Sequence, residues 1–152
     1  MRNALFILLF LCFCAGGLWQ DNSNESETDT SDPDCQRLLN APYFADGVVG
    51  EGGEIPEEIY ALNRLVKKTN ARQYLYKLAK EAGNEGKMYA LCGLYDLDQA
   101  YFFARVGTYR ISDETVVFMA GCIRMNEYPV RKLMEDFANG VIPARIKQYG
   151  QE

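Results

Sequence analysis

Two aspartates, Asp96 and Asp98, flank Leu97 and are the residues whose type and spacing best suit acid–base chemistry. Glycoside hydrolases use a pair of carboxylates in this way, one as an acid and the other as a base or nucleophile. The same two residues stand where a helix can begin, and aspartate is a preferred helix-capping residue. Two interpretations therefore stay open, a carboxylate site of a hydrolase and a simple helix cap.

Other catalytic chemistry is strongly restricted, because the chain contains no histidine. This excludes histidine-based triads, cysteine–histidine pairs and histidine metal sites. The glycine-rich motifs that bind phosphates or dinucleotides, and the Gly-x-Ser-x-Gly nucleophile motif, are absent as well. We expect no cofactor and no metal, and we assign no catalytic residue.

Five cysteines are present, of which Cys12 and Cys14 lie in an N-terminal apolar run. The other three are Cys35, Cys92 and Cys122, and thiols of an exported chain are expected to be oxidised. Of the three pairings we favour a structural Cys92–Cys122 disulfide, because both residues lie in the well-patterned half of the chain, whereas Cys35 lies at the edge of the acidic segment. In the chain-entropy model, closing a loop of this length stabilises a domain by about 3–4 kcal/mol.

Aromatic residues are abundant, with ten tyrosines and eight phenylalanines. Tyr89, Tyr95, Tyr101 and Tyr109 gather around the centre of the chain. They can pack in a core, or they can form an aromatic face that binds another protein, since tyrosine is enriched at protein interfaces.

The N-terminus indicates export. Arg2 is followed by an unbroken apolar run from Ala4 to Ala15 and then by Gly16 and Gly17, the three parts of a signal peptide over residues 1–17. The run is shorter than the ~20 apolar residues that span a bilayer. We expect a periplasmic or secreted protein with no stable membrane insertion after cleavage.

Charge is placed unevenly along the remaining chain. Asp21 to Asp34 holds six acidic and no basic residues, whereas from Cys35 onward 15 acidic residues face 15 basic ones. A polar segment of one sign cannot offset its ordering entropy, so we expect residues 18–34 to be a disordered acidic linker. The neutral domain over residues 35–152 has scattered basic residues, which gives no indication of nucleic-acid binding.

The spacing of apolar residues predicts a mainly α fold, a compact bundle of five to six short helices. Five segments have clear helical patterns, namely 56–68, 71–82, 86–95, 99–106 and 129–139. Shorter helical candidates lie at 35–40 and 143–149. Residues 42–53 are rich in glycine and are expected to be irregular, with Tyr43 and Phe44 anchored on the core. Residues 112–125 are ambiguous: Ser112 can begin a helix, while the β-branched residues near 115–125 favour a small β-hairpin.

The segment 86–95 is apolar on almost every side, so it is expected to be the central helix with others packed against it. Its pattern Gly86-x-x-Tyr89-Ala-Leu-x-Gly93-Leu resembles the helical hairpins of HEAT-type α-repeats. No second copy occurs at a fixed period. The resemblance therefore implies a helical-hairpin-like centre and carries no function.

These observations predict an exported helical domain that acts by binding another protein, either in an envelope complex or as an immunity protein that neutralises a toxin. The alternative is a carboxylate-dependent hydrolase with its site near Asp96 and Asp98. The two predictions differ in one observable, which is whether those carboxylates share a concave pocket.

Overall fold

The computed structural model describes residues 31–151. The predicted signal peptide, and residues 18–30 of the predicted linker, lie outside the described residues. As expected, the fold is mainly α with a small β element. The helices are α1 (Pro33–Leu39), α2 (Glu57–Leu65), α3 (Ala71–Glu81), α4 (Asn84–Leu97), α5 (Gln99–Arg110), α6 (Met134–Ala138) and α7 (Val141–Tyr149). The strands are β1 (Phe44–Val49), β2 (Thr115–Gly121) and β3 (Ile123–Pro129). Within residues 31–151 no helix is long and apolar enough to cross a membrane.

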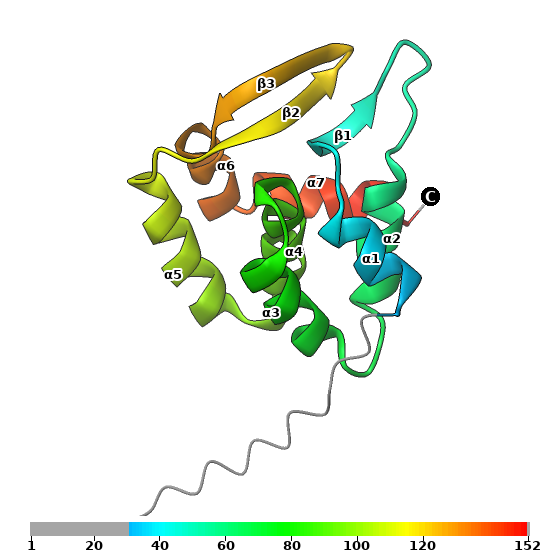
Figure 1. Ribbon diagram of the computed structural model, residues 1–152, viewed down its shortest axis with the longest axis vertical. Coiled ribbons are helices and arrows are strands. Elements are labelled where there is room, and N and C mark those ends of the chain that lie inside the picture. Colours follow the sequence, from blue (N-terminus) through cyan, green and yellow to red (C-terminus); the bar gives the residue numbers. More distant parts are fainter. Residues whose placement is uncertain (1–30, 152) are drawn as a thin grey trace, which may run out of the picture.

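Helix α4 is central, as its apolar pattern predicts. Every residue from Met88 to Leu94 is buried, and α1, α2, α3, α5 and α7 all pack against it. Figure 1 shows α4 in the middle of the molecule, with α5 on one side and α1 and α2 on the other. The close approach of α1 to α4 depends on Gly86, because a Cβ at this position would collide with the Leu38 carbonyl oxygen of α1. The same Cβ would lie 2.7 Å from the Ala82 Cβ.

The ambiguous segment near 115–125 is extended. Strands β2 and β3 form an antiparallel hairpin that turns at Gly121, whose φ of 57° suits glycine. The hairpin lies across one end of the helical layer, with β1 beside β2 (Figure 1). The helical alternative for this segment is therefore excluded.

Strand β1 corrects the prediction that residues 42–53 are irregular. It pairs in parallel with β2, with Phe44 opposite Phe118. The Phe44 ring packs against Tyr89 at 4.9 Å, Phe137 at 5.9 Å and Phe118 at 6.0 Å between ring centroids. The Tyr89 hydroxyl, buried in the core, accepts a hydrogen bond of 3.1 Å from the Ala45 N–H. The sequence did not predict this strand for two reasons. Asp46 and Gly47 have a low β propensity, and the partner strand β2 lies far away in sequence.

Helix α1 begins at Pro33, two residues before the domain boundary predicted at Cys35. The Asp32 carboxylate caps it by accepting hydrogen bonds from the N–H groups of Asp34 and Cys35. Asp34 binds Arg64 with Nη2–Oδ1 at 2.7 Å, and Lys68 pairs with both Asp32 and Asp34. The last residues of the predicted acidic linker are therefore part of the folded domain, because bases on and just after α2 neutralise them.

The single helix predicted over 129–139 is divided in the structure. Pro129 ends β3, a 3₁₀ turn follows over Val130–Lys132, and α6 begins at Met134. The Val130 N–H donates to the Glu114 carbonyl at 2.9 Å, which extends the hairpin pairing and delays the helix. The apolar residues that suggested the helix are nevertheless all buried: Val130, Leu133, Met134 and Phe137.

Candidate functional site: a cavity between α2, α4 and α7

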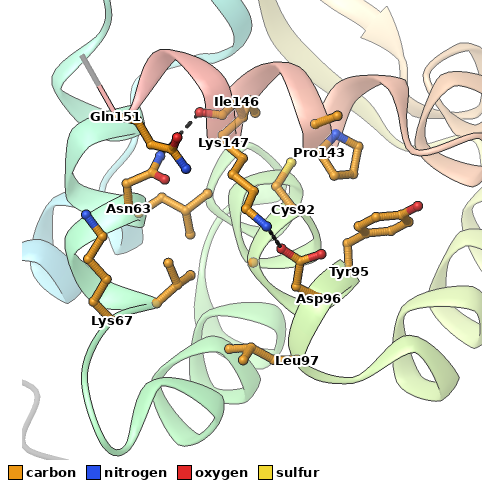
Figure 2. Close-up of a pocket in the computed structure, with 14 residues that line it drawn as sticks. Asn63, Lys67, Cys92, Tyr95, Asp96, Leu97, Pro143, Ile146, Lys147 and Gln151 are labelled. Carbon is orange, nitrogen blue, oxygen red and sulfur yellow. Dashed lines mark hydrogen bonds and ion pairs between the residues drawn. The ribbon is translucent and has the colours of Figure 1, made fainter.

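A cavity of about 350 Å³ lies between α2, α4 and α7. Figure 2 shows its lining side chains, which come from these three helices and from the residues just beyond α2 and α7. Its apolar walls include Leu62, Val66, Leu97, Pro143 and Ile146. The volume is at the lower end of the range typical of ligand pockets.

The contacts of Asn63 hold the cavity in shape. Its side-chain amide donates to the Ile59 carbonyl at 2.9 Å and to the Ile146 carbonyl at 3.3 Å, which ties α2 to α7. A side chain at Gly150 would collide with this amide. The end of α7 therefore lies directly against α2, and the wall between them is formed by buried, hydrogen-bonded groups.

Charged groups stand at the rim of the cavity. Lys147 Nζ lies 2.6 Å from Asp96 Oδ2, and this pair joins α7 to α4 (Figure 2). The two side chains are 59% and 51% exposed. Lys67 is exposed and has no ion-pair partner among residues 31–151. The rim thus presents two ammonium groups and one carboxylate around an apolar interior.

Asp98 serves a different purpose. It is the N-cap of α5: its Oδ1 accepts from the Tyr101 N–H at 3.0 Å, and its Oδ2 accepts from the Tyr76 hydroxyl. These two hydrogen bonds hold the pKa of Asp98 below its usual value. Asp98 does not line the cavity, whereas Asp96 does. The structure therefore does not bring the two carboxylates into a common pocket, and Asp98 takes the capping role that the sequence also suggested.

The four tyrosines do not share one surface. Tyr89 and Tyr109 are buried in the core, where burial raises the pKa of both. Tyr95 is half-buried, lines the cavity and packs edge-to-face on Phe102 at 5.1 Å. Tyr101 lies elsewhere, against Tyr76. Packing is thus the role of Tyr89 and Tyr109, and of the four only Tyr95 lines the cavity.

The predicted Cys92–Cys122 disulfide is not formed in the structure, where Cys35, Cys92 and Cys122 are free thiols. Cys92 is buried at the cavity wall, and burial raises its pKa well above the usual value. Cys122 is exposed at the turn of the β2–β3 hairpin, where the neighbouring Gly121 carbonyl accepts from the Gly50 N–H at the end of β1. The two thiols therefore belong to different parts of the fold, the helical layer and the tip of the sheet.

Sequence reasoning missed the residues that make this site. Asn63 lies in α2, Lys67 follows the end of α2 and Lys147 lies in α7. The sequence predicts helices at these places, but it contains no local signal for the packing of α7 on α2 that brings the three residues together. In the part of the chain that the structure describes, no group of three or more cysteine and acidic side chains could hold a metal ion.

Comparison with protein-family models, with curated proteins and with solved structures finds no match for this chain.

Proposed function

We propose that this protein is an exported helical domain that acts by binding another protein at the cavity between α2, α4 and α7. The observation that carries the proposal is the combination of apolar walls with a charged rim at a hollow on the surface. Interfaces take most of their binding free energy from a few anchors that fill such hollows, surrounded by a polar border.

The partner is either a component of an envelope complex or a toxin that the protein neutralises. Export is the basis for both, and it rests on the signal-peptide pattern of residues 1–17.

A hydrolase is less well supported. The two carboxylates proposed for it interact with different groups: Asp96 forms an ion pair with Lys147, and Asp98 caps the start of α5. A general acid at neutral pH needs a raised pKa, whereas the hydrogen bonds to Asp98 lower the pKa of this carboxyl.

Site-directed photo-crosslinking tests the proposal. A photoreactive phenylalanine analogue at the position of Lys67 should give a covalent adduct with a discrete protein in the cell that makes this chain. The same analogue at Lys80, an exposed position on α3 outside the cavity, is the matched control. Equal adducts at both positions, or none at position 67, would contradict a binding site here.

A second variant blocks the cavity without disturbing the core. Ala144 is exposed on α7 and lines the cavity, so Ala144→Trp should fill its mouth and abolish the adduct at position 67. Ala104→Trp makes the same change at an exposed position of α5 and should leave the adduct intact.

A further inference from the structure

We infer that the partner presents an acidic peptide segment, in which one large apolar side chain enters the cavity and neighbouring carboxylates meet Lys67 and Lys147. This inference rests on the proposed protein-binding function and adds the chemistry of what is bound. It follows from three features of the site.

The first feature is the apolar interior. Leu62, Val66, Leu97 and Ile146 line the hollow. Leu62 and Ile146 are almost completely buried, whereas Val66 and Leu97 are only half-buried and keep apolar surface exposed. Burying apolar surface there is favourable by roughly 25 cal/mol per Å² of area removed from water. An aromatic or long aliphatic side chain is the natural occupant.

The second feature is the charge around the mouth. Lys67 has no ion-pair partner in the part of the chain that the structure describes, and it is placed at the rim on the α2 side. On the α7 side, Lys147 pairs with Asp96 but its side chain remains 59% exposed, so its ammonium group can donate a hydrogen bond to a second carboxylate. The rim has one net positive charge, although the domain from Cys35 onward is neutral. Two lysines on opposite sides of the hollow favour carboxylates before and after the apolar anchor.

The third feature is the way the site opens to solvent. Its rim residues Lys67, Asp96, Ala144 and Lys147 are all exposed, and they stand on three helices or helix ends. A ligand that satisfies both lysines must therefore extend beyond the hollow on two sides. A peptide does this, with its backbone across the mouth and one side chain directed inward.

Three capped pentapeptides test the inference: acetyl-Gly-Glu-Phe-Glu-Gly-amide, the same peptide with both Glu replaced by Lys, and the same peptide with Phe replaced by Ala. Each is titrated into ¹⁵N-labelled protein, and amide chemical shifts report both affinity and location. We expect the Glu-Phe-Glu peptide to shift amides of α2, α4 and α7. The other two peptides should bind at least about fivefold more weakly, since an exposed ion pair and a buried ring each contribute on this scale.

Charge reversal on the protein gives the matched control. Lys67→Glu should lower the affinity for the Glu-Phe-Glu peptide about fivefold and raise the affinity for the Lys-Phe-Lys peptide about fivefold. Lys80→Glu makes the same change outside the cavity and should alter neither affinity, while unchanged spectra elsewhere show that both variants fold.

The outcomes separate the inference from the proposed function. Preferential binding of the Lys-Phe-Lys peptide at the cavity overturns the acidic partner and leaves a protein-binding site in place. Chemical-shift changes confined to other elements, or no changes with any peptide, also overturn the inference. The photo-crosslinking experiment at position 67 tests the proposed function independently of these titrations.

Discussion

At the scale of single residues, Asp32 has two tasks. Its carboxylate accepts the first N–H groups of α1 and forms an ion pair with Lys68. Burial alone would raise the pKa of this carboxyl, but the hydrogen bond from Lys68, the Cys35 N–H and the Lys68 charge together outweigh burial and lower it. The charged form is therefore the one that the folded state favours.

This gives a pH dependence of known sign. A carboxyl whose pKa is lowered on folding stabilises the protein above its unfolded pKa of about 3.9, and the stabilisation is lost as the pH falls through the folded value. Asp32→Asn keeps a capping side chain without the charge. It should lower the free energy of unfolding by about 0.5–1 kcal/mol at pH 7 and have little effect at pH 2, measured by urea unfolding.

Asp113→Asn is the control for this measurement. Asp113 is fully exposed and pairs with Arg131 at 3.0 Å, so its loss should change stability very little at either pH. If Asp32→Asn lowered the free energy of unfolding equally at pH 2 and pH 7, the negative charge of Asp32 would not be the source of the stabilisation.

The thiols allow a direct test of the disulfide. A chain that begins at Leu18 has three cysteines, and in the native state only the exposed Cys122 should react quickly with a maleimide. Cys35 and Cys92 should react after unfolding in urea, because both are buried and burial raises the pKa of each. Mass spectrometry of the native protein should show one label. A protein with the Cys92–Cys122 bond would show none in the native state and one after unfolding.

At the residue scale, the sequence predicted the cap at Asp98 as one of two interpretations, and it identified Tyr95 and Asp96, which line the cavity. It could not identify Lys67 or Lys147 as neighbours of the same hollow. Lys67 lies just after α2 and Lys147 lies on the exposed side of α7, and both are ordinary exposed lysines in the sequence. Their common role arises only when α2 and α7 pack together.

At the scale of the elements, the close contact of α1 with α4 depends on Gly86. Gly86→Ala should lower the free energy of unfolding by about 1–3 kcal/mol or more, because the added methyl group collides with backbone of α1 and overpacks the contact. Urea unfolding followed by circular dichroism measures the change.

Gly107 provides the matched substitution. It lies in α5, and a Cβ there meets no atom within 4 Å. Gly107→Ala should therefore stabilise the protein by about 0.5–1 kcal/mol, the ordinary gain of alanine over glycine in a helix. Equal effects of the two substitutions would contradict the close packing of α1 on α4.

Helices α2 and α3 were predictable because each shows its apolar stripe within a short window, with Ile59 and Leu62 in α2 and Leu75 and Leu78 in α3. Strand β1 was not, because the residues Asp46 and Gly47 within it disfavour a strand locally. It is stabilised by β2 and by the packing of Phe44, neither of which its own sequence reveals.

At the scale of the whole molecule, the folded unit begins before Cys35. A chain that starts at Ser31 should be as stable as one that starts at Leu18. A chain that starts at Cys35 should lose about 1–3 kcal/mol, because it lacks the Asp32 cap and the ion pairs with Arg64 and Lys68. Urea unfolding of the three chains is the measurement, and equal stability of all three would place the boundary at Cys35 after all.

The parallel pairing of β1 with β2 has a consequence for the order in which the molecule forms. Four helices, α2 to α5, lie between the two strands in sequence, so the strands can meet only after a long loop has closed. Loop closure of this kind slows folding, whereas contacts between successive helices form early. A folding chain should therefore pass through a helical intermediate in which Phe44 and Phe118 are still in contact with water. During that interval the edge of β2 that later pairs with β1 is open to pairing with other chains.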